Sequence, residues 1–325
     1  MNEKLSRPQF NQMDTTEKQT LMESLAARYN MTFLDLHTFD RWGQSSTTGI
    51  FEKDGRKFVF VPGDTVTLGW EQFAVGLNQE SREELEYLFR EWEMEPQNPE
   101  EMIRESMAPV RQAAIGPMLV GRELEELCWE SVKMDDPRLT AHPDWLKEFR
   151  DFAWSDSSSL TLHQSARIER TEDGFQTWIY NRTDYDELLT GLEKQGLSLP
   201  TADEWAYLCG GGCQTLFPWG DGLDYSMRLR WFEDMDEDEN RPYDMEEPNF
   251  FGLSIAYDPY MREVVQADRL TTCGGDGGRS ICGGLGIFLG FLPCSPHCKP
   301  EVQEDNERNG DHDFHRPIIR VKMGV

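Results

Sequence analysis

The feature that most constrains the fold is a change in the character of the sequence at Gly210. Before this residue, several segments have apolar side chains at helical spacing, and short strand-like segments separate them. After it, glycine becomes dense and the helical periodicity is lost, which is typical of loops joined by short strands. A chain that combines these features is predicted to have an α+β fold.

The part before Gly210 contains specific local signals. Asp54-Gly55 joins two strand-like segments, 49–53 and 57–61, and this dipeptide is a strong signal for a hairpin. Two pairs of residues have the spacing of a capping box at a helix start, Ser81 with Glu84 and Thr201 with Glu204. A further strand is predicted at 176–180, and helices are predicted at 15–29, 81–92, 99–113, 120–133, 143–153, 184–195 and 201–209.

The formal net charge of the chain is -28 over 325 residues. Such a surface repels phosphate groups, so neither nucleic acid nor an anionic membrane surface is an expected partner. A basic protein or peptide, or a divalent cation, is compatible with it. No segment approaches the ~20 apolar residues of a membrane helix, and the N-terminus lacks the apolar stretch of a secretory signal. The expected location is therefore the cytoplasm.

Acidic residues are most concentrated at 233–247. A solvated loop is the simpler interpretation of this segment. A calcium site is the alternative, because hard cations take several oxygen ligands. The spacing lacks the central glycine and terminal glutamate of an EF-hand, which favours the loop.

Six of the seven cysteines lie after residue 208. In a chain without an export signal they are expected to be free thiols. Cys209 with Cys213, and Cys294 with Cys298, form two C-x3-C pairs whose spacing suits a structural zinc site, with His297 as an alternative ligand. The competing interpretation is burial, since free cysteines often pack as small apolar side chains.

Four stretches of the sequence, in order, resemble the formylglycine-generating (sulfatase-modifying factor) family. The most specific is LPTADEWAY at 199–207 followed by FPWGD at 217–221; the others are FVFVPG at 58–63, PNFFGL at 248–253 and IIRV at 318–321. The resemblance implies a C-type-lectin-like α+β fold, rich in loops, with short antiparallel strands and flanking helices. It covers residues 48–325 and leaves residues 1–47 as a helical N-terminal extension.

The positions that carry the chemistry of the family differ in this chain. The family's segment GNVWEW, which helps to hold calcium, corresponds to residues 258–263, where Pro259 and Arg262 replace the asparagine and the glutamate. Calcium is therefore not expected there, because the site would lose a carboxylate and gain a positive charge. The family's segment RGGSW, with its active-site serine, corresponds to residues 273–277, where Cys273 replaces the arginine and Asp276 replaces the serine.

Active members of the family bind copper(I) with a C-x4-C pair and use oxygen to convert a substrate cysteine into formylglycine. The nearest pair here is Cys294 and Cys298, with one residue fewer between them. Soft thiolates suit copper(I), so these cysteines would be its ligands, and Asp276 would occupy the place of the serine. Two functions are therefore predicted. The favoured one, because three functional motifs are altered, is a non-catalytic module that binds a protein, a peptide or a small ligand; the alternative is a copper-dependent oxidase acting on a peptidyl cysteine.

Overall fold

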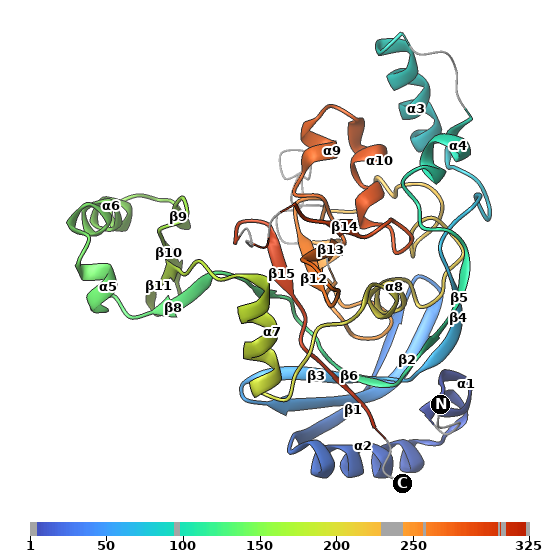
Figure 1. Cartoon of the computed structure of the whole chain (residues 1–325), viewed down its shortest axis with the longest axis horizontal. Coiled ribbons are helices and arrows are strands. Elements are labelled where there is room, and N and C mark those ends of the chain that lie inside the picture. Colours follow the sequence, from blue (N-terminus) through green and yellow to red (C-terminus); the bar gives the residue numbers. More distant parts are fainter. Residues whose placement is uncertain are drawn as a thin grey trace.

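The computed structural model describes residues 5–93, 98–228, 243–255, 258–304, 306 and 310–322. Within these ranges the chain forms short helices and several sheets that are mostly antiparallel, which confirms the predicted α+β class (Figure 1). None of the helices described is both long enough and apolar enough to cross a membrane.

The molecule is built on a five-stranded antiparallel sheet with the order β1-β2-β3-β6-β16 (Figure 1). Its strands are β1 (Thr32–Arg41), β2 (Gln44–Lys53), β3 (Arg56–Val61), β6 (Met118–Gly121) and β16 (Ile318–Arg320). The predicted hairpin joins β2 to β3, and both turn residues, Asp54 and Gly55, have the positive φ that this tight turn requires. Because side chains alternate along a strand, β3 contributes Phe58 and Phe60 to one apolar cluster and Val59 to another.

The N-terminal helices α1 (Arg7–Gln12) and α2 (Thr15–Tyr29) pack on the face that carries Phe58 and Phe60. Both helices lie within the expected N-terminal extension of residues 1–47. The next segment forms β1, and the boundary between residues 47 and 48 lies inside β2. The reason is local: Trp42 and Gly43 both adopt positive φ, so the chain turns back and β1 pairs with β2 along its whole length.

The opposite face of the sheet packs against α8 (Ala202–Gly210), which begins with the predicted capping box. Four hydrogen bonds connect this short helix to distant segments. The Tyr207 hydroxyl donates to the carbonyl oxygen of Pro62 at 2.9 Å, and the Asn249 amide donates to that of Leu208 at 2.8 Å. The Arg320 guanidinium donates to the Glu204 carboxylate at 2.7 and 2.5 Å. Helix α8 therefore connects β3, the 248–253 loop and β16.

A second five-stranded sheet has the order β14-β13-β12-β15-β7. Its strands are β7 (Glu125–Glu126), β12 (Arg262–Val265), β13 (Thr271–Cys273), β14 (Glu301–Val302) and β15 (Asp313–His315). The fully buried Arg316 joins the two sheets. Its guanidinium donates to Glu263 of β12 at 3.1 Å and to the carbonyl oxygens of Gly121, the last residue of β6, and Arg122 at 2.6 and 2.9 Å.

Residues 129–180 form an arm that projects from the rest of the molecule, here called the body (Figure 1). The arm has a separate apolar cluster. It consists of β8 (Trp129–Val132), α5 (Pro137–Thr140), α6 (Pro143–Ala153), β9 (Ser159–Leu162), β10 (Ala166–Thr171) and β11 (Gly174–Tyr180). The predicted helix at 143–153 and strand at 176–180 are confirmed. The predicted helix at 120–133 is wrong, because this segment pairs with distant strands as β6, β7 and β8.

The remaining elements surround the loop-rich part of the body. They are β4 (Asp64–Leu68), α3 (Gln79–Glu91), α4 (Pro99–Arg104), β5 (Arg111–Ile115), α7 (Tyr185–Lys194), η3 (Asp244–Glu246), α9 (Arg279–Cys282), α10 (Gly286–Gly290) and η4 (Leu292–Cys294). The predicted helix at 99–113 ends at Arg104, since its last residues pair with β4. The predicted capping box of Ser81 with Glu84 is also wrong: Asn78 caps α3, and Glu84 instead accepts backbone N–H groups of α10.

Arg316 provides a test of how the two sheets are joined. Replacing Arg316→Met keeps most of the volume but leaves the Glu263 carboxylate buried without its cation, which costs about 3–5 kcal/mol of unfolding free energy. Urea unfolding measures this loss. The control is Arg138→Met, which removes an ion pair with Glu130 on the exposed surface of the arm and should unfold close to the wild-type midpoint. Equal midpoints for the two variants would contradict the assigned role of Arg316.

Candidate functional site

Cys273, Asp276 and Cys298 line one cavity of about 160 Å³. Cys273 ends β13, Asp276 lies in the glycine-rich loop that follows, and Cys298 comes after η4. Trp205 of α8 also lines the cavity. The fold therefore brings together Asp276 and Cys298, two of the three predicted catalytic residues. Cys273, which the sequence analysis named only as a replacement for the family's arginine, lines the same cavity.

The loop that carries Asp276 is held by close backbone packing. A Cβ atom at Gly275 would lie 2.1 Å from the carbonyl oxygen of Met261, so only glycine fits there. One oxygen of Asp276, Oδ2, accepts hydrogen bonds from the Ser280 backbone at 2.9 Å and from its hydroxyl at 2.5 Å. These contacts fix the carboxylate while its residue is only 8% exposed.

Two polar atoms of this site are buried without a hydrogen-bond partner among the described residues, Oδ1 of Asp276 and Nε1 of Trp205. One is an acceptor and the other a donor. Buried polar atoms of this kind are usually satisfied by water or by a ligand. The site can therefore offer hydrogen bonds of both kinds to a small polar molecule.

Cys294 lies behind the cavity and is not exposed. Burial raises its pKa well above the ordinary value, and the charges of Asp258 and Asp276 add to the effect. Burial also raises the pKa of Cys298 to about 12, with further contributions from Asp276 and Glu301. The three predicted catalytic residues thus lie close enough to influence one another. Both thiols are protonated at neutral pH, whereas the thiolate is the nucleophile and the metal ligand.

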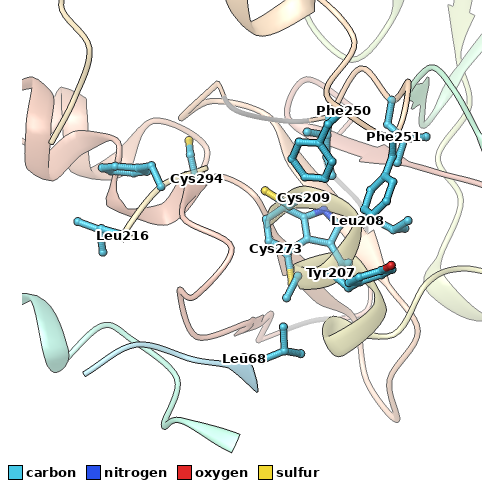
Figure 2. Close-up of a cluster of buried hydrophobic side chains, with 14 of the residues drawn as sticks. Leu68, Tyr207, Leu208, Cys209, Leu216, Phe250, Phe251, Cys273 and Cys294 are labelled. Carbon is cyan, nitrogen blue, oxygen red and sulfur yellow. The ribbon is translucent and has the colours of Figure 1, made fainter. Parts of the chain in front are cut away.

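The two cysteines of the first C-x3-C pair have different surroundings. Cys209 is buried in the main apolar cluster with Cys273 and Cys294, beside aromatic side chains (Figure 2). Cys213 instead lies 3.8 Å from Nε2 of His297. Among the described residues, no group of three or more His, Cys, Asp or Glu side chains is arranged to hold a metal ion. The structure therefore does not support the four-ligand zinc site suggested by the sequence.

Arg262, in the segment that the resemblance aligns with the family's calcium ligands, forms an ion pair with Asp313. Arg262 of β12 lies opposite Asp313 of β15 in the parallel register. Its Nε donates to Asp313 Oδ1 at 2.8 Å, and a second guanidinium nitrogen lies 2.6 Å from the same oxygen. Asp313 is only 1% exposed. The acidic residues 233–242, the other candidate for calcium, lie outside the described residues.

No family model matches this chain, and no curated protein matches it. The likeness to the formylglycine-generating family therefore rests on the sequence blocks named above.

His297 provides a test of the site's electrostatics. Burial lowers the pKa of His297 to about 4 from 6.5, and its Nε2 lies 3.0 Å from the carbonyl oxygen of Thr215. Between pH ~4 and pH ~6.5 the imidazole of His297 is protonated in the unfolded chain but neutral in the folded one, so the unfolded chain binds more protons. The stability that comes from neutral His297 is therefore complete above pH ~6.5 and falls as the pH drops toward ~4. The wild type should lose about 3 kcal/mol more than a His297→Gln variant over this range.

Urea unfolding at a series of pH values between ~7 and ~4 measures this difference. The matched control is His163→Gln, which makes the same replacement at an exposed position of the arm. If the gap in unfolding free energy between the wild type and His297→Gln is the same at both ends of the range, the assigned environment of His297 is wrong.

Proposed function

We propose that this chain is a divergent protein with the C-type-lectin-like fold of the sulfatase-modifying factor family, and that it acts as a non-catalytic binding module. The sequence blocks that resemble the family come together around α8. Tyr207, in the first block, bonds to Pro62 in another, and Asn249 bonds to Leu208 at the end of the first. These contacts support a shared scaffold but not a shared activity, because function depends on the site.

The observation that carries the non-catalytic function is the pair of Arg262 with Asp313. At the segment where the resemblance places a calcium ion, a guanidinium already neutralises the buried carboxylate. A cation there would meet a fixed positive charge and would have to displace two short contacts. On this proposal the guanidinium of Arg262 provides the positive charge that a metal ion provides in the family.

The small cavity supports the binding part of the proposal. Its residues Asp276 and Trp205 each contain a polar atom without a hydrogen-bond partner among the described residues. Its volume of about 160 Å³ suits a few water molecules or a small polar group. The thiols of Cys273 and Cys298 in its wall are protonated and therefore weakly nucleophilic.

The alternative function is a copper-dependent oxidase that converts a peptidyl cysteine to formylglycine. The observation that favours it is the proximity of Cys294, Cys298 and Asp276. If copper(I) binds, these two thiols would hold it and each would first lose its proton, while Asp276 would occupy the position of the family's serine. Bound copper would supply the activation of oxygen.

Copper(I) titration against a competing chelator distinguishes the two functions. The reduced wild type and a Cys294→Ser/Cys298→Ser variant should take up copper equally weakly, because burial keeps both thiols protonated. Cys282→Ser is the control for adventitious binding, since Cys282 is the exposed cysteine. Tight one-to-one binding that the double variant loses, with oxygen consumption when a cysteine peptide is added, would establish the oxidase instead.

A further inference from the structure

A larger cavity, of about 670 Å³, lies where the arm meets the body. Glu169 lines it from β10 of the arm, whereas Glu126 and Phe314, which face each other in the β7–β15 pair, line it from the body. The short helix η3 and the segment before β12 complete the wall, with Glu246 and Asp258. Junctions of this kind are common positions for binding sites.

The floor of this cavity is apolar. Met245, Ile255 and Phe291 belong to the main apolar cluster of the body and are at most 8% exposed, and Met261 and Phe314 lie next to them at the surface of the cavity. An apolar side chain that enters the cavity would therefore contact apolar atoms and leave water, which is the main favourable contribution to most associations.

The walls of the cavity are acidic. Glu123, Glu126, Glu169, Glu246 and Asp258 line it, and its described lining includes no lysine or arginine. The chain as a whole has a formal net charge of -28, so its long-range field adds to the local one. This combination attracts a cationic ligand and repels an anionic one.

The protein itself shows which cation this wall accommodates. The guanidinium of Arg167, in the arm, makes two bonds to Glu126 at 2.8 and 2.6 Å and lies 3.2 Å from Glu169. It also lies over the rings of Trp129 and Trp178, at 5.0 and 4.4 Å from their centres. Glu126, which lines the cavity, therefore already binds a guanidinium in the forked geometry that favours arginine, and Glu169 lies beside the same guanidinium.

We propose that this cavity binds a peptide segment of a partner protein in which arginine or lysine side chains alternate with apolar ones. The apolar side chains occupy the floor formed by Ile255 and Phe291, and the cationic ones lie against the wall at Glu123, since Arg167 already meets Glu126 and Glu169. This inference rests on the proposed binding function and names the chemistry of its partner. It involves residues other than Cys273, Asp276 and Cys298, which line the smaller cavity.

The test uses a fluorescein-labelled octapeptide in which arginine alternates with leucine, and it measures fluorescence anisotropy with the full chain. Glu123→Lys places a positive charge in the wall, and Met261→Ser removes apolar surface from the floor. Each should raise the Kd by about tenfold or more. Glu193→Lys, which makes the same change of charge on the exposed surface of α7, should change the Kd by less than about twofold.

Three results would overturn the inference. An octapeptide of arginine and serine that binds as tightly as the leucine peptide would show attraction by net charge alone. An equal loss of affinity for Glu193→Lys and Glu123→Lys would also show that net charge alone attracts the peptide. Displacement of the peptide by calcium chloride, but not by sodium chloride at matched ionic strength, would make the cavity a cation site.

The proposed peptide partner and the proposed non-catalytic function can be contradicted independently of each other. Copper(I) binding that depends on Cys294 and Cys298 would replace the non-catalytic function, yet it would not change the effect of Glu123→Lys on the peptide. Conversely, equal affinity of the peptide for the wild type and for Glu123→Lys would contradict the proposed peptide partner. It would not affect the evidence from Arg262 and Asp313.

Discussion

The arrangement of the body depends on the buried pair of Glu263 and Arg316. Neither side chain is exposed, and removing two charges from water costs several kcal/mol per ion, which only close and multiple contacts offset. Arg316 meets this condition, because its guanidinium also donates to carbonyl oxygens at the end of β6 and to Ser254. Since Arg316 lies between β15 and β16, one side chain fixes the position of both strands, and hence of both sheets.

Three arginines act as internal cations in this strongly acidic chain. Arg316 neutralises Glu263 within the core, Arg262 neutralises Asp313 between β12 and β15, and Arg167 neutralises Glu126 between the arm and the body. A planar guanidinium suits this purpose because it makes several bonds at once and remains charged. The carboxylates of Glu263 and Asp313 are thus neutralised inside the fold, and that of Glu126 is neutralised at the wall of the larger cavity.

Local signals in the sequence predicted part of the fold. The Asp54-Gly55 hairpin and the Thr201–Glu204 capping box depend on residues within a few positions, and both formed as expected. The helix expected at 120–133 did not form, because pairing with distant strands decided its structure. The proximity of Asp276 to Cys298 followed from the family resemblance. The larger cavity could not be predicted, since its lining comes from segments that only the tertiary fold brings together.

The contacts around α8 show which parts of the chain the fold depends on. The blocks that resemble the family bond to one another through backbone carbonyls and through the pair of Glu204 with Arg320. Substitution within them would break the packing around α8. Arg262, at a position that the resemblance aligns with a functional motif of the family, has a partner of its own in Asp313. Arg262 therefore maintains the fold by neutralising a buried carboxylate, so the fold depends on this position as well as on the blocks around α8.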